Sequence, residues 1–301
     1  MKTLIFTVCH QDLLPFADVL KASLPADIPF RIGMVGSKHP DTVSLSEVAP
    51  DAVFAQDYDQ NALVAASKPF FATHFLKEAE AVIYFDATVK VFENLNSVTE
   101  TLQNADILLT PRLTQTFGQS EYGDEKLFLN SGMYDAGFWG LRRTENTQRF
   151  LEWYQARLAD RAHFDLCHGM NHDQLWLNYV PILFDKVTVA KNIGWNVALH
   201  NLHERVLTPT RMGWQVNQLE ALVFMNFKEC LSKESDIEML IKKSGTKKLI
   251  ENYQILIPSA NLASVFSLRK AMQPTTVRWK QTLRQNLQSV IDFIETFPLY
   301  H

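Results

Sequence analysis

Short apolar runs alternate with amphipathic stretches along the first 230 residues. Residues 4–8 and 81–85 are continuously apolar, which is typical of strands buried on both faces of a sheet. Apolar residues spaced three and four apart in residues 12–23 indicate a helix. The same pattern predicts further strands at residues 30–35, 52–55, 106–110, 137–141 and 187–190, a loop at 113–126, and further helices that start at Lys68-Pro69 and Thr144 and span residues 172–179.

Strands that alternate with helices predict an α/β fold, with a mostly parallel sheet flanked by helices. Ligands of such sheets collect at the carboxyl ends of the strands, and Asp86 directly follows the apolar run 81–85. Beyond residue 231 the alternation stops, and residues 237–241 and 279–293 have a helical pattern. We therefore expect one domain at residues 1–230 and a helical extension at residues 231–301.

The charge of the chain is unevenly distributed. The formal net charge of −4 over 301 residues argues against a nucleic acid partner. Residues 231–301 carry 10 Lys and Arg against 6 Asp and Glu, whereas residues 1–230 carry 19 against 27. The basic extension would suit peripheral contact with an anionic membrane or an acidic acceptor, and a solvated helical face is the plainer interpretation.

Cysteine usage and hydropathy indicate the cellular compartment. Cys9, Cys167 and Cys230 are widely spaced and give neither a disulfide framework nor a zinc motif. The first apolar run is too short for a signal peptide, and no run reaches the roughly 18 apolar residues of a membrane span. We expect a cytoplasmic protein, peripheral to the membrane if the basic extension binds there.

Two segments carry polar groups near the ends of predicted strands. Asp86 would be costly to bury without a partner such as a ribose hydroxyl or a divalent cation, and capping the next turn is its alternative role. Residues 130–140 combine small residues, which allow a ligand close to the backbone, with the polar side chains of Asn130 and Asp135. A turn before a strand is the alternative for this second segment.

Three further polar groups lie later in the chain. Asp173 and Gln174 offer a carboxylate and an amide at adjacent positions, although Asp173 would also serve as a helix N-cap. His168 and His172 have the spacing of two metal ligands on one helix face, but no Glu-x-x-His pattern accompanies them. Arg205 would bind a phosphate or form a salt bridge with a neighbouring acid.

Several common enzyme motifs do not occur in the sequence. The dinucleotide loop Gly-x-Gly-x-x-Gly, the Gly-Lys-Thr phosphate loop and the Gly-x-Ser-x-Gly elbow are all missing. This pattern disfavours an α/β oxidoreductase, an NTPase of the phosphate-loop type and a serine hydrolase of the elbow type.

Taken in order, the polar segments resemble bacterial GT-A glycosyltransferases related to glycosyltransferase family 8, over roughly residues 1–228. Lys68-Pro69 before a helix, and then a strand that ends in Asp86, are similar to the family's approach to its Asp-x-Asp motif. Here only the first Asp is kept, because Thr88 stands in place of the second. Asn226 stands where relatives have a metal-binding His.

Other matches to the family are single short segments. Asp135-Ala136-Gly137 is similar to the Asn-Ala-Gly stretch of the sugar pocket, and Asp173-Gln174 to an Asp-Gln pair near the anomeric carbon. The resemblance implies catalytic roles for Asp173, Gln174 and Asp135. It implies contacts with the donor for Thr7, Lys68, Asp86, Thr88, Asn130, Ser131, Gly132, Ala136, Gly137, Asn196, Asn201 and Arg205.

The family resemblance also implies the reaction. A hexosyltransferase-like enzyme would move a sugar from a nucleotide-diphospho-sugar, with a UDP-sugar favoured, to a glycan or lipid-linked acceptor, as in polysaccharide biosynthesis. Retention of anomeric configuration is implied by the resemblance alone. The alternative is a catalytically degenerate nucleotide-sugar binding or scaffolding protein.

Metal use is expected to be weak. Thr and Asn are poor ligands for a hard cation, so Mn²⁺ or Mg²⁺ would be weakly held, with Asp86 as its one predicted ligand. Basic side chains would then neutralise the diphosphate instead, and the candidates are Lys68, Arg112, Arg142 and Arg205.

Overall fold

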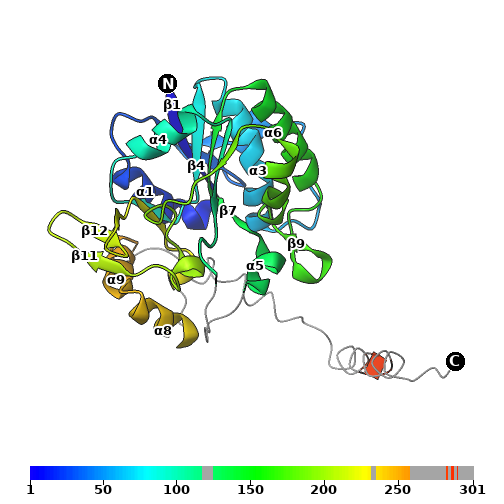
Figure 1. Cartoon of the computed structure of the whole chain (residues 1–301). Helices are drawn as coiled ribbons and strands as arrows, with labels where there is room; N and C mark the ends of the chain where they lie inside the picture. The colour runs from blue at the N-terminus through cyan, green and yellow to red at the C-terminus, as the bar shows by residue number, and fades with distance from the viewer. Residues whose placement is uncertain (117–124, 232–234, 258–282, 284–285, 288–289, 291–301) are drawn as a thin grey trace. The chain divides into compact units, whose positions relative to one another are not determined.

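Seven strands form the central sheet of the computed structural model, which describes residues 1–116, 125–231 and 235–257 and the single positions 283, 286, 287 and 290 (Figure 1). Their order is β10-β6-β7-β4-β1-β2-β3, and every neighbouring pair is parallel except the two pairs that β7 makes. The predicted α/β fold with a mostly parallel sheet is confirmed. The strands are β1 (Thr3–Cys9), β2 (Phe30–Met34), β3 (Val43–Ser44), β4 (Ala81–Phe85), β6 (Ile107–Pro111), β7 (Tyr134–Arg142) and β10 (Val187–Val189).

Side chains on the two faces of the sheet enter two separate cores. Phe6, Tyr84 and Trp139 pack together on one face, with ring centroids 5.0–5.6 Å apart. Ile83 and Phe85 alternate with Tyr84 along β4 and enter the core on the other face. Burying each of these side chains contributes about 1.5–3 kcal/mol. Helices α3 (Gln60–Phe75) and α6 (Glu145–Leu158) cover the first face, and α1 (Leu14–Ser23) and α4 (Asn96–Gln103) the second (Figure 1).

Short strands and turns surround the carboxyl edge of the sheet. The remaining strands are β5 (Val89–Val91) with β14 (Phe224–Asn226), β8 (Phe164–Asp165) with β9 (Met170–Asn171), and the group β11 (Leu207–Pro209), β12 (Trp214–Val216) and β13 (Glu220–Ala221). The shorter helices are α2 (Leu45–Val48), α5 (Lys126–Ser131) and α7 (Val180–Leu183). Single 3-10 turns are η1 (Gln11–Leu13), η2 (Leu166–His168), η3 (Leu175–Tyr179), η4 (Leu199–Asn201) and η5 (Glu229–Leu231).

Two further helices follow residue 231, α8 (Ser235–Lys243) and α9 (Lys247–Leu256). The first of them confirms the helix predicted at residues 237–241. Tyr253 of α9 stacks on Phe227 with ring centroids 4.0 Å apart. Contacts group residues Met1–Leu262 and Ala263–His301 as two units, and nearly all of the second lies outside the described residues. The boundary predicted near residue 230 therefore stays a prediction, and the predicted helix at 279–293 lies mostly outside the described residues.

Two elements differ from the sequence prediction near the amino end. Residues 52–55 form no strand, and the sheet ends instead at Val43–Ser44, which pairs with β2. Helix α3 does not start at Lys68-Pro69 but at Gln60, where the Asp59 side chain accepts a hydrogen bond from the Ala62 amide. Pro69 thus lies inside the helix. The N-cap carries the stronger signal here, because eight helix-compatible residues precede Lys68.

Differences elsewhere concern element type and length. The predicted helix at 172–179 is the 3-10 turn η3, which starts at Leu175 and leaves Asp173 before it as a site residue and not as its cap. Strand β7 begins at Tyr134, three residues before the prediction, so that residues 135–137 are part of the sheet. Part of the predicted loop at 113–126 lies outside the described residues. Among the described helices, none combines the length and apolarity needed to cross a membrane.

Candidate active site

Strand β4 delivers Asp86 to the carboxyl edge of the sheet, as predicted. Its Oδ1 accepts a hydrogen bond of 2.7 Å from the Tyr84 hydroxyl, and its Oδ2 lies 3.4 Å from Asn226 Nδ2. Burial alone would raise the pKa of Asp86. The charges of Lys68 and Lys228 and these two hydrogen bonds outweigh burial, so that the pKa lies below its ordinary value. Asp86 is therefore a carboxylate at neutral pH.

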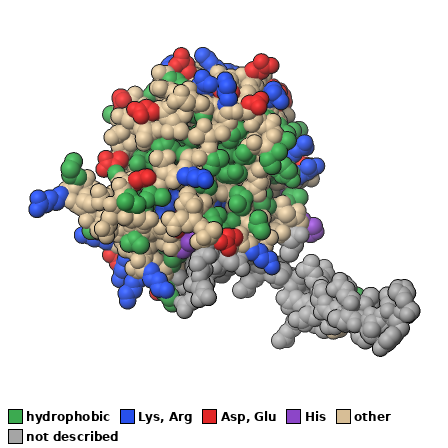
Figure 2. Space-filling model, in the orientation of Figure 1, with side chains coloured by type: hydrophobic (Ala, Val, Ile, Leu, Met, Phe, Trp, Pro, Cys, Tyr) green, Lys and Arg blue, Asp and Glu red, His purple; other side chains and the backbone are tan. Residues whose placement is uncertain are grey.

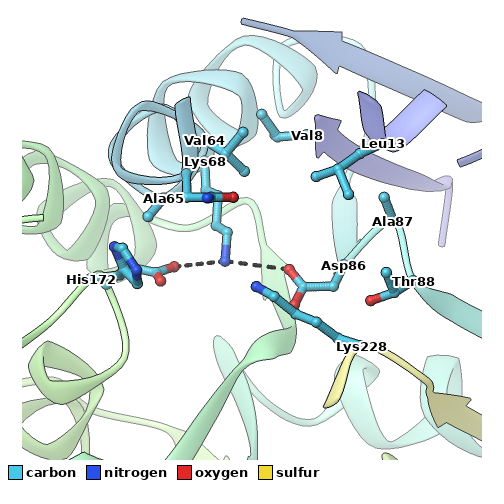
Figure 3. Close-up of a pocket in the computed structure, with 12 residues that line it drawn as sticks. Val8, Leu13, Val64, Ala65, Lys68, Asp86, Ala87, Thr88, His172 and Lys228 are labelled. Atoms are coloured by element: carbon cyan, nitrogen blue, oxygen red, sulfur yellow. Dashed lines mark ion pairs between the residues drawn. The ribbon is translucent and has the colours of Figure 1, made fainter. Parts of the chain in front are cut away.

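Lys68 joins two carboxylates from different parts of the chain (Figure 3). Its Nζ lies 2.8 Å from Asp173 Oδ2 and 3.5 Å from Asp86 Oδ1, and it donates a 3.0 Å hydrogen bond to the Ala136 carbonyl. The Lys68 side chain is only 6% exposed. Burial would lower its pKa, but the charges of Asp173 and Asp86 raise it above the ordinary value. A fixed ammonium thus lies between two carboxylates.

These groups line a pocket with about 60 Å³ of space for the centres of water-sized molecules and about 490 Å³ of empty space once open solvent is included. Apolar side chains of Val8, Leu13 and Val64 form one wall, and the charged groups form another (Figure 3). Such a mixture of an apolar wall and a few polar groups is typical of small-molecule sites. The complete lining is Val8, Leu13, Asn61, Val64, Ala65, Lys68, Asp86, Ala87, Thr88, His172, Asp173 and Lys228.

Thr88 and Asn226, at the two positions that the resemblance assigns to metal ligands, bond to each other. Thr88 Oγ1 donates to Asn226 Oδ1 at 2.8 Å, and the Lys228 amide donates to the same oxygen at 3.1 Å. No group of three or more His, Cys, Asp and Glu within the described ranges is arranged to hold a metal ion. A divalent cation prefers several carboxylate or carbonyl oxygens, and of the three positions that the resemblance assigns to metal ligands only Asp86 is a carboxylate. Metal use therefore stays a prediction.

Asp135 lies on β7 beside the pocket rather than on its wall. Its Oδ1 accepts a 2.6 Å hydrogen bond from the Gly137 amide, and its Oδ2 lies 3.4 Å from His200 Nε2. Burial raises the pKa of Asp135, although the Arg112 charge opposes this. A Cβ on Gly137 would lie only 2.8–2.9 Å from side-chain atoms of Asp135, Asp86 and Asn226, so that these polar groups would have to shift to accept a larger residue there.

A second polar cluster connects α5 to the segment after β9. Gln174 Nε2 donates to the Ser131 carbonyl at 2.6 Å, and Arg112 Nη1 donates to Ser131 Oγ at 2.6 Å and to the Gly132 carbonyl at 3.3 Å. Gly132 has a φ of 111° beside Gln174, where a side chain would be strained and crowded. Asn130 is exposed on α5.

Of the other predicted donor contacts, Asn196, Asn201 and Arg205 are buried and form internal hydrogen bonds. Asn201 Nδ2 donates to the Asn196 carbonyl at 3.0 Å, and Asn196 Nδ2 donates to Thr110 Oγ1 at 3.0 Å. Arg205 Nη1 donates to the Trp195 carbonyl at 2.7 Å. Thr7 is buried in β1, with no hydrogen-bond partner for its hydroxyl among the described residues. Donor contact by these residues stays a prediction.

Arg142 does not lie near Asp86, and His168 and His172 do not form the pair on one helix face that their spacing suggested. Arg142 pairs with Asp106 at 2.7 Å and lies opposite Ala81, at the other end of β4 from Asp86. His168 Nδ1 bonds to an Asp165 carboxylate oxygen, whereas His172 Nδ1 bonds to the Ala162 carbonyl. These two histidines therefore face different partners and lie on no common helix.

Lys228 is the charged pocket residue that sequence reasoning missed. It enters the pocket from the chain that follows β14, across from Lys68 (Figure 3). It lies two residues after Asn226, whereas Phe227 between them is buried against Tyr253. No motif marks Lys228 in the sequence, because it is a turn residue that follows the end of β14.

No protein-family model and no curated protein matches this sequence. Among solved structures, the galactosyltransferase LgtC in complex with donor and acceptor sugar analogues aligns with 13% identity and a TM-score of 0.48, over 80% of this chain and 95% of that one. A glycosyltransferase involved in the glycosylation of the major capsid of PBCV-1 aligns with 9% identity and a TM-score of 0.44, over 79% and 98%. Mouse xyloside xylosyltransferase 1 aligns with 13% identity and a TM-score of 0.38, over 66% and 87%. What this chain does is therefore inferred from its own pocket.

Proposed function

We propose that this protein is a glycosyltransferase that moves a sugar from a nucleotide-diphospho-sugar to an acceptor hydroxyl. The observation that carries this proposal is the row Asp173–Lys68–Asp86 in the pocket, with Lys228 across from it. Breaking the bond between a sugar and a diphosphate builds negative charge on the leaving group and positive charge on the sugar ring. The row offers fixed charges of both signs to that reaction.

The roles of the charged groups follow from the signs of these charges. Lys68 and Lys228 would stabilise the leaving diphosphate, and Asp173 would stabilise the sugar ring as it becomes positive. Asp86 would accept a hydrogen bond from the donor ribose and keep Lys68 charged. Because these charges are held by the fold before the ligand binds, little reorganisation is needed during the reaction.

The finer features of the proposal rest on the family resemblance. They are a UDP-sugar as donor, a glycan or lipid-linked acceptor, retention of anomeric configuration, and the roles of Gln174 and Asp135. The apolar wall of Val8 and Leu13 would suit a flat nucleobase beside the charged groups.

A donor screen tests the proposed function. Thermal unfolding is measured with a panel of nucleotide-sugars, and release of nucleoside diphosphate from the best one is then followed for several hours. A ligand present at 100 times its Kd stabilises the folded state by about 2.7 kcal/mol, which is a clear shift in Tm. Stabilisation with release is expected. Stabilisation without release would favour the degenerate binding protein, and a panel with no effect would refute the proposal.

We further propose that lysines replace a divalent cation at the diphosphate. Lys228→Gln should weaken nucleoside diphosphate binding about tenfold, because it removes one of the two ammonium groups in the pocket. Chelation by EDTA should leave binding by the wild-type protein unchanged. Isothermal titration measures both, and Lys77→Gln, on an exposed lysine outside the pocket, is the matched control. Loss of binding in EDTA that Mn²⁺ restores would contradict this assignment.

Peripheral membrane contact would use the lysines around the α8–α9 connection. Lys242 and Lys243 end α8, Lys247 and Lys248 begin α9, and all four are exposed. Basic side chains gather over this corner of the molecule (Figure 2). Each lysine near an anionic surface contributes about 1 kcal/mol at most, so that four suffice for weak binding.

Vesicle sedimentation at low salt tests this contact. The wild-type protein should sediment with vesicles that contain phosphatidylserine and not with neutral ones. Changing the four lysines to Gln should reduce the bound fraction at least tenfold. The matched control replaces four exposed lysines elsewhere, Lys2, Lys21, Lys38 and Lys77, by Gln. Equal losses in both variants would show that net charge alone matters and would refute the patch.

A further inference from the structure

His172 has a strained backbone beside the pocket. Its φ is 48°, in the left-handed region that residues other than Gly seldom adopt. Two hydrogen bonds hold it there: its amide donates to the His163 carbonyl at 3.0 Å, and its Nδ1 lies 2.8 Å from the Ala162 carbonyl. Strain that the surrounding structure maintains is a common feature of functional sites.

The contact with Ala162 fixes the tautomer of the His172 ring. A carbonyl oxygen only accepts hydrogen bonds, so that Nδ1 must carry the proton and donate it. Burial lowers the pKa of His172, and the Lys228 charge lowers it further, so that the ring is neutral at pH 7. Nε2 is then a lone-pair acceptor. It is buried, and among the described residues it has no hydrogen-bond partner.

His172 Nε2 differs in charge and in hydrogen bonding from the lysines, carboxylates and threonine that line the same pocket. The two lysines only donate hydrogen bonds, and Asp86 and Asp173 are charged acceptors that are each ion-paired with Lys68, whereas His172 Nε2 is a neutral acceptor with no partner among the described residues. Thr88 donates its hydroxyl hydrogen to Asn226. His172 lies on the Asp173 side of the pocket, away from Thr88 (Figure 3). It is therefore placed to accept a hydrogen bond from a ligand that enters there.

The chemistry of the ligand decides which part reaches His172. Phosphate oxygens accept hydrogen bonds and do not donate them at neutral pH, so that the diphosphate is excluded as the partner of a neutral imidazole lone pair. A sugar hydroxyl donates and fits this position. Building on the proposed function, we propose that His172 Nε2 accepts a hydrogen bond from a hydroxyl of the transferred sugar and thereby selects for the sugar part of the donor.

His172→Asn is the first test. Asn tolerates left-handed backbone, and its Nδ2 can replace Nδ1 as the donor to Ala162, but it has no acceptor at the position of Nε2. The affinity for the nucleotide-sugar found by the donor screen should fall about 5- to 30-fold, which is the effect of one hydrogen bond to a buried group. The affinity for the corresponding nucleoside diphosphate should change less than about twofold, and this comparison controls for folding.

His39→Asn is the matched control. The His39 Nδ1 also lies 2.8 Å from a carbonyl, that of Pro40, but the residue is exposed and outside the pocket. It should leave both affinities unchanged. If His172→Asn lowered the affinities for both ligands equally, His172 would have a structural role or contact the nucleoside. If it lowered neither affinity, His172 Nε2 would accept no hydrogen bond from the sugar. Each of these outcomes overturns the inference.

The wild-type protein offers a second test that needs no variant to fold. With ¹⁵N-labelled histidine, the Nε2 resonance of His172 should move when the nucleotide-sugar binds and should stay in place with the nucleoside diphosphate. An unmoved resonance in the sugar complex overturns the inference even if the proposed function holds. A wild-type protein that binds no nucleotide-sugar refutes the proposed function itself, so that the two failures are distinguishable.

Discussion

Lys68→Met is expected to lower the free energy of unfolding by about 3–5 kcal/mol, because it leaves the buried Asp173 and the half-buried Asp86 without the cation that lies between them. Asp173 is 5% exposed and Asp86 19% exposed, and both are ion-paired with Lys68. Urea denaturation at pH 7 measures the change as a shift of the midpoint at constant slope. Lys77→Met, on an exposed lysine, is the control and should change stability by less than about 0.5 kcal/mol.

The pH dependence of this difference gives an independent test. The pKa of Asp86 is lowered in the folded protein, so that its contribution to stability is present above its ordinary value of 3.8 and is lost as the pH falls. In Lys68→Met the unpaired carboxylates can be protonated at low pH. The stability difference between the two proteins should therefore shrink as the pH is lowered from 7 to below 3.8, through the lowered pKa of Asp86. A constant difference would show that lost packing of the lysine stem, and not charge, is the cause.

A double variant separates the charge from the cavity. Asp173→Asn added to Lys68→Met removes one of the two unpaired charges, so that part of the lost stability should return. If Asp173→Asn lowers the stability of the Lys68→Met variant by as much as it lowers that of the wild-type protein, the side chains of Lys68 and Asp173 do not interact. The 2.8 Å ion pair between Lys68 and Asp173 would then contribute nothing to stability.

The position of Asp86 at the carboxyl edge of the sheet could be predicted because the apolar run before it is a strong and local signal. A run of five apolar residues at 81–85 has few alternatives to a buried strand, and a carboxylate directly after it must lie at the strand end. The row between Asp86 and Asp173 was not predictable in the same way. It depends on Lys68, which lies inside α3, eight residues after the helix begins, and contacts both carboxylates from there.

The remaining differences between the structure and the sequence-based expectations concern single residues and one short segment. Lys228 was not predicted as a pocket residue because it belongs to no motif, and its position in the pocket depends on how β14 pairs with β5. Asp135, which the family resemblance assigns to the sugar pocket, lies 3.4 Å from His200 Nε2, and its role stays a prediction. Residues 52–55 have the composition of a strand, yet β2 takes its edge partner from Val43–Ser44. Pairing between distant segments decides the positions of Lys228 and of the edge strand, and local pattern contains little information about it.

Thr88 and Asn226 form hydrogen bonds within the chain at the edge of the pocket. Here the hydroxyl donates to the amide oxygen at 2.8 Å, and the amide nitrogen lies 3.4 Å from Asp86 Oδ2. With Lys68 paired to the same Asp86 and Lys228 across the pocket, positive charge is supplied by the chain itself.

Asp173→Asn should reduce turnover of the nucleotide-sugar about 100- to 1,000-fold, which corresponds to roughly 3–4 kcal/mol of transition-state stabilisation. The substitution keeps the shape of the side chain and removes the negative charge that would face the sugar ring as it becomes positive. Donor affinity should stay within about threefold, because Lys68 keeps its contacts with Asp86 and the Ala136 carbonyl. Steady-state assays of nucleoside diphosphate release separate kcat from KM and distinguish this effect from lost binding.

The control for this last prediction is Asp160→Asn, which makes the same chemical change on an exposed aspartate outside the pocket and should leave kcat unchanged. Assays at a temperature where both variants remain folded exclude lost stability as the cause. If Asp173→Asn turned over at the wild-type rate, Asp173 would serve only to hold Lys68. The reaction would then depend on the two lysines at the diphosphate, because they would be the remaining charges of the pocket able to stabilise the leaving group.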